Sequence, residues 1–350
     1  MNELDQEKNV KTTTQRRGGE AVRLTELGLG TAQFGNLYRE ATDDDVRQAF
    51  EAAWEAGVRY FDTAPHYGLG LSERRLGELL SEHDRSEFTI STKVGKLLVP
   101  NPSGEDSQDD QGFAVPAVVK RQWDFSAEGV TRSLESSLDR LGLDRVDIVY
   151  VHDPDDFGDQ VVAEAIPALV ELRDRGVVGA IGTGMNQSAL PARFVRETDI
   201  DLVMLAGRFS LLDQGALDDL LPAALARGVG IVAAGAYNSG VLATDRPPRD
   251  AKYDYDTVPP EIVERAWAIA DVCERHGVTL PEAAVAFPRR HPAVVSTVLG
   301  MRNGAQAEEN IRRFAVDVPD ALWTDLEERS LIRPLPTGSP VAPTSAGRLS

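Results

Sequence analysis

The amino-acid sequence predicts one α/β domain folded as a closed (β/α)8 barrel, or TIM barrel, and three observations support this fold class. Short apolar strands alternate with amphipathic helices along most of the chain, which is the pattern of a parallel sheet with helical crossovers. Eight strand–helix units can be traced, and closing such a sheet removes both of its edges. An open doubly wound sheet would instead carry a Gly-x-Gly-x-x-Gly turn, but residues 28–33 read GLGTAQ.

Each expected strand is a short apolar run. In chain order the strands are expected at residues 24–29, 58–62, 89–93, 146–152, 178–182, 202–206, 230–234 and 295–299. The first helix should begin after Thr42, whose side chain can cap it, because the aspartates at 43–45 suit the positive end of a helix dipole. The remaining helical patterns cover residues 72–82, 126–141, 163–175, 188–197, 215–227, 261–290 in two pieces, 305–314 and 320–331.

The domain limits follow from this pattern. Residues 21–333 are expected to form the barrel as a single domain, although a length of 350 residues alone would also allow two domains. A long insertion, acidic in its middle, is expected at about residues 94–123. Residues 1–20 should form a disordered tail and residues 334–350 a flexible one, because both segments lack an apolar period.

Composition narrows the function. The formal net charge is −19 and the pI is about 4.7, so nucleic acids and anionic membrane surfaces are not expected partners, although a local basic pocket can still bind an anionic cofactor. No apolar stretch approaches the roughly 20 residues of a membrane-spanning helix, and residues 1–20 lack the apolar segment of a signal peptide. We therefore expect a cytoplasmic protein. No metal-ligand spacing is found, so no metal is expected, and the oligomeric state stays open.

Ionisable side chains stand at the ends of three successive expected strands. Asp62, Lys93 and His152 occupy these positions, and Tyr67 lies five residues beyond Asp62 in the loop that leaves the same strand. Barrels of this kind build their active sites at the carboxyl ends of the strands. The four side chains should therefore meet at one mouth of the barrel.

These residue types suit proton transfer to a substrate oxygen. A tyrosine has an ordinary pKa of about 10, which a nearby ammonium group can lower. Lys93 can supply that charge, Asp62 can be its counter-ion, and His152 can orient a substrate oxygen. The set fits carbonyl reduction, with hydride from a nicotinamide and a proton from Tyr67. Taken singly, each residue also has a structural explanation as a turn cap, a loop aromatic, a surface lysine or a core histidine.

Several motifs carry a family resemblance. Residues 58–68 read VRYFDTAPHYG, residues 133–152 read SLESSLDRLGLDRVDIVYVH, and residues 298–300 read VLG with Glu309 and Asn310 following. These segments resemble the aldo-keto reductase family over roughly residues 24–331, and the resemblance implies a catalytic tetrad of Asp62, Tyr67, Lys93 and His152.

Other segments point to a subgroup of that family. Residues 28–35 read GLGTAQFG, residues 205–213 read LAGRFSLLD and residues 236–242 read AYNSGVL. They resemble the D-threo-aldose 1-dehydrogenase subgroup, which includes L-fucose dehydrogenase-like and pyridoxal 4-dehydrogenase-like enzymes. The resemblance implies oxidation of a sugar hemiacetal or similar small alcohol with Tyr67 as the base, and reduction of an aldehyde in reverse.

The resemblance also implies contacts with the cofactor and the substrate. Asn186 is expected at the nicotinamide carboxamide, the loop of Gly235, Tyr237 and Ser239 at the pyrophosphate, and Asn310 at the adenine. Thr31, Asp62, Gly300, Arg302, Gln306 and Glu309 complete the expected cofactor contacts, while Trp123 and His152 are the expected substrate contacts. Three positions depart from the family pattern, with Met185, Ala206 and Ala234 where Asn, Gln and Tyr are common.

The cofactor is expected to be NAD rather than NADP. Many NADPH-preferring members place a Lys and an Arg where this chain has Gly300 and Gln306. Arg302 is the nearby cation, while Glu308 and Glu309 add negative charge.

Other functions remain open at this stage. A pyridoxal 4-dehydrogenase-type enzyme, a general aldehyde reductase, or a regulatory subunit that senses the cofactor could use the same barrel. A metal-dependent barrel hydrolase or isomerase would need more His and carboxylate ligands at the strand ends than the sequence offers.

Overall fold

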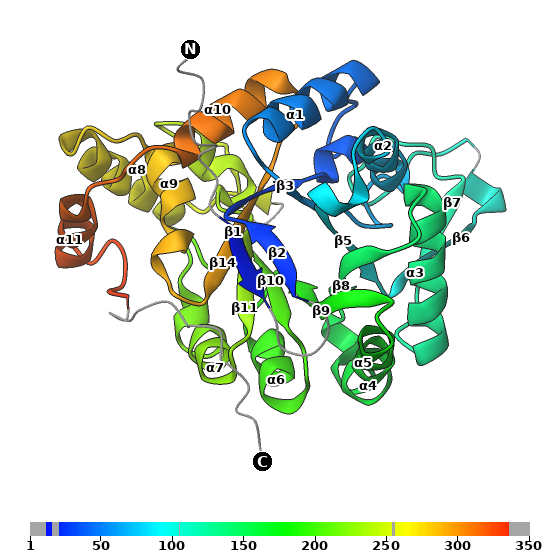
Figure 1. Cartoon of the computed structure of the whole chain (residues 1–350). Coiled ribbons are helices and arrows are strands. Elements are labelled where there is room, and N and C mark those ends of the chain that lie inside the picture. The colour runs from blue at the N-terminus through cyan, green and yellow to red at the C-terminus, as the bar shows by residue number, and fades with distance from the viewer. Residues whose placement is uncertain (1–11, 16–20, 105, 254–255, 336–350) are drawn as a thin grey trace, which may run out of the picture.

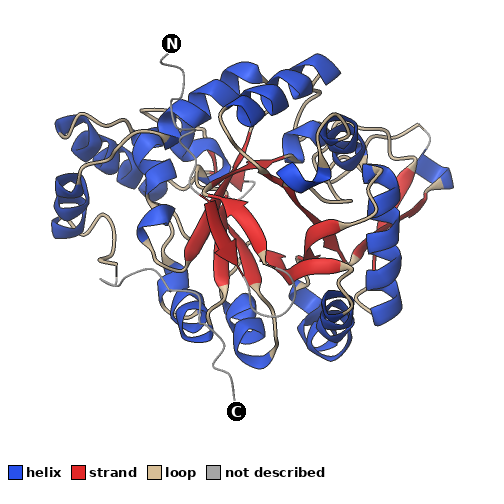
Figure 2. Cartoon of the chain, viewed as in Figure 1, coloured by secondary structure: helices blue, strands red, loops and turns tan. Residues whose placement is uncertain are grey.

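A computed structural model describes residues 12–15, 21–104, 106–253 and 256–335. Its centre is a closed barrel of parallel strands in the order β3-β4-β5-β8-β9-β10-β11-β14, surrounded by helices (Figures 1 and 2). The strands are β3 (Leu27–Gly30), β4 (Tyr60–Asp62), β5 (Thr89–Val94), β8 (Val146–His152), β9 (Val178–Met185), β10 (Leu202–Ala206), β11 (Gly230–Ala234) and β14 (Val294–Gly300). The predicted fold class is confirmed.

The helices follow the strands as the alternation predicts. They are α1 (Asp43–Glu55), α2 (Leu71–Leu80), α3 (Ala127–Leu141), α4 (Gly158–Gln160), α5 (Ile166–Asp174), α6 (Ala189–Glu197), α7 (Leu220–Arg227), α8 (Pro260–Arg275), α9 (Leu280–Ala286), α10 (Gly304–Phe314) and α11 (Asp320–Glu328). Thr42 caps α1 as expected, because its side chain accepts from the Asp45 amide and the Asp45 carboxylate accepts from the Thr42 amide.

Two apolar layers hold the barrel. One lies between the strands and the helices, and a smaller one fills the barrel interior around Tyr60, Ile148, Tyr150 and Leu202. The two interior tyrosine hydroxyls lie 3.2 Å apart, so their polar ends are satisfied by one another.

A short hairpin covers the amino-terminal end of the barrel. Thr12–Gln15 forms β1 and pairs antiparallel with β2 (Val22–Thr25). The expected tail over residues 1–20 is therefore wrong for Thr12–Gln15, since backbone pairing with β2 needs no apolar pattern. The rest of that segment, and most of the tail expected at 334–350, lie outside the described residues.

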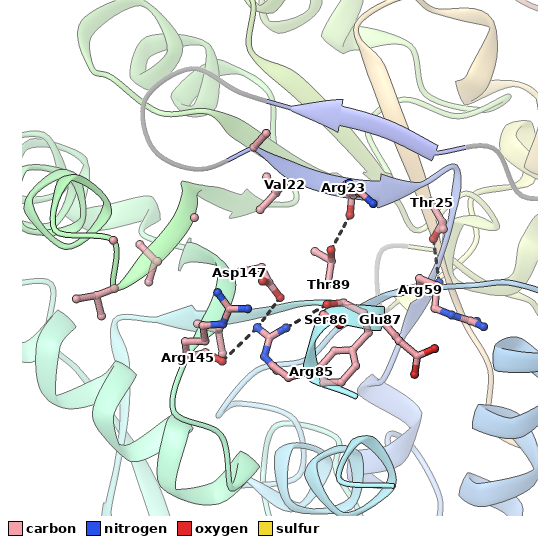
Figure 3. Close-up of a pocket in the computed structure, with 17 residues that line it drawn as sticks. Val22, Arg23, Thr25, Arg59, Arg85, Ser86, Glu87, Thr89, Arg145 and Asp147 are labelled. Atoms are coloured by element: carbon pink, nitrogen blue, oxygen red, sulfur yellow. Dashed lines mark hydrogen bonds and ion pairs between the residues drawn. The ribbon is translucent and has the colours of Figure 1, made fainter. Parts of the chain in front are cut away.

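A cavity of about 600 Å³ lies at this same end, beside β2 (Figure 3). Several arginines line it, but two of them already form hydrogen bonds with other groups of the protein. Arg85 donates to the Asp147 carboxylate at 2.7 Å and to the Phe88 carbonyl. Arg59 donates to backbone carbonyls and its guanidinium stacks on Trp54. These contacts tie loops together, so we do not assign this cavity a ligand.

The insertion forms a second hairpin, which lies beside the cavity that contains Tyr67 and Lys93. Its strands are β6 (Lys96–Pro100) and β7 (Val119–Trp123), paired antiparallel so that Lys96 faces Trp123. Between them, Phe113 and Val115 pack against Leu69 and Tyr67 in a separate apolar cluster. The insertion is thus fixed to the loop that carries Tyr67.

Two further hairpin strands, β12 (Lys252–Tyr253) and β13 (Asp256–Thr257), were not expected from the sequence. Among the described residues no helix is long and apolar enough to cross a membrane.

Candidate active site

The four predicted catalytic residues meet at the carboxyl ends of β4, β5 and β8. The Lys93 ammonium donates to the Asp62 carboxylate at 2.7 Å, to the Tyr67 hydroxyl at 3.0 Å and to the Thr63 carbonyl at 3.0 Å. The rings of Tyr67 and His152 meet edge to face, with their centroids 5.9 Å apart. One buried ammonium therefore links the carboxylate to the phenol, and the histidine closes the cluster.

The Tyr67 loop is held by a close backbone approach. A Cβ at Gly35 would lie 2.5 Å from the Tyr67 carbonyl carbon, and one at Gly68 would lie 2.3 Å from the Gly35 oxygen. Gly68 also has a φ of 62°, a left-handed conformation that glycine adopts readily. The segment around Gly35 and the Tyr67 loop can touch only because both positions are glycine.

A hydrogen-bond chain supports Asp62 from inside the barrel. Ser91 donates to the second Asp62 oxygen at 2.7 Å, and the Tyr60 hydroxyl lies 3.1 Å from the Ser91 hydroxyl. Both carboxylate oxygens thus have partners, which is what a buried charge requires. The Asp62 carboxylate is therefore fully hydrogen-bonded and serves as the counter-ion of Lys93.

The electrostatics of Tyr67 differ from the sequence-based expectation. Burial raises the pKa of Tyr67 to about 12, and the lowering by Lys93 does not fully offset it. Lys93 lowers the pKa of Tyr67 as expected, but the net shift is upward, because burial disfavours the phenolate and the Asp62 charge works in the same direction as burial. Burial opposes the charge of Lys93, but Asp62 and Tyr67 still raise the Lys93 pKa above its ordinary value.

His152 is a neutral imidazole in this environment. Burial, together with the charges of Lys96 and Lys93, holds the pKa of His152 well below its ordinary value. Its Nε2 lies 3.4 Å from an Asp153 carboxylate oxygen, and its buried Nδ1 has no hydrogen-bond partner among the described residues. A neutral histidine here can donate a single hydrogen bond to a substrate oxygen.

Two adjoining cavities meet at this cluster. One, of about 660 Å³, contains the four residues, and the other, of about 770 Å³, runs between β11, β14 and α10. They share wall residues, namely Gln33, Leu37, Tyr38, Asn186, Ala206, Gly235, Val298 and Gly300. Together the two cavities form one continuous cleft, and one end of this cleft reaches Tyr67. An extended ligand can lie along it.

Most of the predicted cofactor residues line this cleft. Asn186 and Gly300 line both cavities, and Thr31 lines the one around Tyr67. The Thr31 hydroxyl is already engaged, since it donates to the Asp62 carbonyl at 2.8 Å. The second cavity contains the other predicted residues except Arg302, namely Gly235, Tyr237, Ser239, Gln306, Glu309 and Asn310.

Two predicted residues are not part of the cleft wall. Arg302 donates to the Leu37 carbonyl at 2.6 Å and to the Arg39 carbonyl at 2.8 Å, and it lines neither cavity. Trp123 lies on β7 with 46% of its surface exposed, and it too lines neither cavity. From the insertion, Phe113 and Lys96 line the mouth instead.

The sequence model of the aldo/keto reductase family matches residues 26–330. The chain belongs to the aldo/keto reductase family. It is an oxidoreductase, and the family uses nicotinamide cofactors.

Curated relatives agree with this assignment, and a solved structure has the same fold. A D-threo-aldose 1-dehydrogenase from a Pseudomonas species is 46% identical over 92% of this chain and 99% of its own length. A pyridoxal 4-dehydrogenase from Microbacterium luteolum is 37% identical over 90% of this chain and 96% of its own. A glycerol dehydrogenase structure from Gluconobacter oxydans superposes with a TM-score of 0.72 at 24% identity, covering 95% of this chain and 99% of that one.

The cleft of this aldo-keto reductase fits a nicotinamide dinucleotide. Gln33 Oε1 and Asn238 Oδ1 are buried acceptors in its wall with no hydrogen-bond partner among the described residues, so they can accept from ribose hydroxyls or an amide. Tyr237 (φ −88°, ψ 1°) is followed by Asn238 (φ 45°), and such a turn presents backbone N–H groups to anions. Within the described residues no three His, Cys or carboxylate side chains are grouped as a metal site requires.

Sequence reasoning missed several residues of the wall. His66, Lys96 and Asp153 lie beside the four predicted catalytic residues, and Arg313 lines the second cavity. Arg313 donates to the Glu309 carboxylate at 3.0 Å and to the Tyr237 hydroxyl at 3.4 Å. His66 stands inside the family motif next to Tyr67, so its position could have been noticed. The others become neighbours only through the fold.

Proposed function

We propose that this aldo-keto reductase oxidises the anomeric hydroxyl of an aldose, with Asp62, Tyr67, Lys93 and His152 as its catalytic residues. The observation that carries the proposal is the cluster in which Lys93 touches both Asp62 and Tyr67 beneath His152. The Tyr67 phenolate takes the hydroxyl proton while the bound nicotinamide supplies the hydride acceptor. His152 donates a hydrogen bond to the reacting oxygen. The same groups can also reduce an aldehyde to an alcohol, with Tyr67 as the proton donor and the reduced nicotinamide as the source of hydride.

A polyhydroxylated substrate suits the remaining wall. Lys96 donates to Asp153 at 2.8 Å, and both side chains line the cavity around Tyr67 beside His66. A simple alkyl aldehyde would make no hydrogen bonds with these polar groups, whereas sugar hydroxyls can pair with them. The 46% identity to a D-threo-aldose 1-dehydrogenase supports the same substrate class.

We further propose that NAD is preferred to NADP. Arg302 is occupied by two backbone carbonyls, so it is not free to grip a 2′-phosphate. Arg313 is the one basic side chain among the described residues of the second cavity, and it is paired with Glu309. The Glu309 carboxylate can accept from a ribose 2′-hydroxyl and would repel a 2′-phosphate.

The test is a steady-state panel of aldoses, pyridoxal and simple aldehydes with both cofactors, followed by nicotinamide absorbance. We expect repeated turnover, the highest kcat/KM for an aldose with NAD, and an unchanged cofactor ratio in Arg302→Ala. Pyridoxal as the best substrate, or a single turnover that stops at bound cofactor, would contradict the proposed activity. A preference for NADP that is lost in Arg302→Ala would contradict the cofactor assignment.

A further inference from the structure

His66 lies next to Tyr67 in the chain, and its ring reaches the same cavity. Its centroid is 5.4 Å from that of His152 and 6.1 Å from that of Tyr67, and the Phe113 ring meets it edge-on at 5.2 Å. The ring therefore stands beside the two groups that hold the reacting oxygen. Nothing in the proposed chemistry uses it.

One ring nitrogen of His66 is held by the insertion. Arg121 of β7 donates from its Nε to His66 Nδ1 and from a terminal nitrogen to the His66 carbonyl at 2.9 Å. The same guanidinium forms an ion pair with both oxygens of Asp109, the second of them at 3.2 Å. The side chains of Arg121 and Asp109 are only 4% and 3% exposed, so this pair is built into the interior.

The contact with Arg121 decides where His66 carries its proton. A guanidinium is a donor that does not deprotonate in proteins, so Nδ1 must be the acceptor and the proton must be on Nε2. Burial, followed by the charges of Lys96, Arg121 and Lys93, lowers the pKa of His66 to about 2. The ring is thus neutral at ordinary pH and has one N–H to donate.

That N–H has no hydrogen-bond partner among the residues that the structure describes. His66 Nε2 makes no hydrogen bond to any side chain or backbone group of the described residues, while the residue lines the cavity beside Tyr67. A donor on a ring whose centroid lies 5.4 Å from that of His152 and 6.1 Å from that of Tyr67 suits a hydroxyl on the carbon next to the reacting one.

We propose that His66 is a substrate-binding residue that donates its Nε2–H to the hydroxyl adjacent to the reacting carbon. Arg121 and Asp109 are positioning residues that fix the tautomer. The insertion therefore selects 2-hydroxy substrates through His66. This inference rests on the proposed function only for the identity of the substrate as a sugar. The role of His66 does not depend on it, because a 2-hydroxyaldehyde presents the same pair of oxygens when it is reduced.

The first test compares kcat/KM for glyceraldehyde and propanal, and for an aldose and its 2-deoxy form, in the wild type and two variants. His66→Phe keeps a ring without the donor, and His66→Gln keeps an N–H. We expect the 2-hydroxyl to raise kcat/KM by about 10- to 100-fold in the wild type, since a site that binds a hydroxyl discriminates against substrates that lack it. The preference for the hydroxylated substrate should vanish in His66→Phe and should return in part in His66→Gln.

A preference for the hydroxylated substrate that is undiminished in His66→Phe would overturn the inference. So would a wild type that treats glyceraldehyde and propanal alike. Failure of the proposed function is distinguishable, because it would appear as no oxidation of a cyclic aldose at its anomeric carbon, while the preference for glyceraldehyde over propanal in the reducing direction still depends on His66.

The second test addresses the tautomer without any substrate. Nitrogen-15 NMR of the imidazole rings, with His66 identified by its loss in His66→Gln, should show an Nε2–H ring that does not titrate near neutral pH. Arg121→Lys keeps a positive charge for Asp109 but loses the planar donor. We expect a mixture of tautomers in that variant and a smaller hydroxyl preference. An Nδ1–H ring in the wild type, or an unchanged spectrum in a folded Arg121→Lys, would refute the role of Arg121.

Discussion

Replacing Lys93 by Met tests whether its ammonium sets the acidity of Tyr67. The Lys93 nitrogen lies 3.0 Å from the Tyr67 oxygen, where a charge pair is worth about 5 kcal/mol before compensation at an effective dielectric constant of about 20. The Asp62 carboxylate lies 2.7 Å from the same nitrogen, and its negative charge cancels a large part of this stabilisation of the phenolate. We therefore expect the pKa of Tyr67, already raised to about 12 by burial, to rise further in Lys93→Met. A rise of about one unit or more would lower the phenolate population about tenfold or more.

The assay is the pH profile of aldose oxidation. Oxidation needs the phenolate, so its rate rises with pH and levels off at the pKa of Tyr67 in the ternary complex. In Lys93→Met we expect the rate near neutral pH to fall about tenfold or more, as the phenolate population does, and the levelling to move to higher pH.

Two further variants make this result interpretable. Lys96→Met removes a neighbouring buried ammonium that makes no contact with Tyr67, so the inflection should stay in place. Since Lys93→Met leaves Asp62 buried without its partner, the double variant with Asp62→Asn guards against loss of fold. An unchanged inflection in folded Lys93→Met and in the double variant would refute the reasoning.

Three other predictions follow from the same geometry. Tyr67→Phe should lower kcat by about 10²- to 10⁴-fold while the dissociation constant of the dinucleotide, measured by fluorescence, stays nearly constant; wild-type turnover would exclude Tyr67 as the proton carrier. Gly35→Ala should displace the Tyr67 loop, because its Cβ would lie 2.5 Å from Tyr67 backbone, and so lower both kcat and Tm, whereas Gly215→Ala meets its nearest atom only at 3.4 Å and should do neither. Burial lowers the pKa of His66 to about 2 and of His291 to about 4, so the unfolded chain takes up these protons below about pH 6.5 while the folded one does not. The free energy of unfolding should keep its full value above that pH and be lower by about 2–3 kcal/mol per histidine at about pH 4.5, as urea unfolding can measure. If the free energy of unfolding depended on pH in the same way in His291→Asn, this prediction would be contradicted.

The barrel could be predicted because its strands have local signals. The expected strands at 146–152, 202–206 and 230–234 agree with β8, β10 and β11 at both ends, since each apolar run is bounded by charged or turn residues. The strand Thr12–Gln15 carries no such signal, because its four residues are all polar and it is held by backbone pairing with β2. Pairing between segments leaves little trace in the composition of either one.

The site was predictable to the extent that it is tied to strand ends. Asp62, Lys93 and His152 stand at carboxyl ends of barrel strands, so their convergence follows from topology alone. Arg302 was expected among the cofactor contacts because it is the cation close in sequence to Gly300 and Gln306. It is instead held by carbonyls at residues 37 and 39, more than 260 positions away, which no local pattern reveals.

Proton handling and substrate selection occupy separate parts of the chain, and this separation can be tested. The groups that shift the pKa of Tyr67 most are its own burial, Lys93, Asp62 and Asp153, and none of them belongs to the insertion at 94–123. The contact that orients His66 comes from Arg121, which does. Arg121→Lys should therefore change the ratio of kcat/KM between an aldose and its 2-deoxy form while leaving the inflection of the oxidation profile where it is in the wild type. Lys93→Met should do the opposite. If Arg121→Lys moved the inflection instead, the insertion would be acting on the proton path, and assigning it to recognition would be wrong.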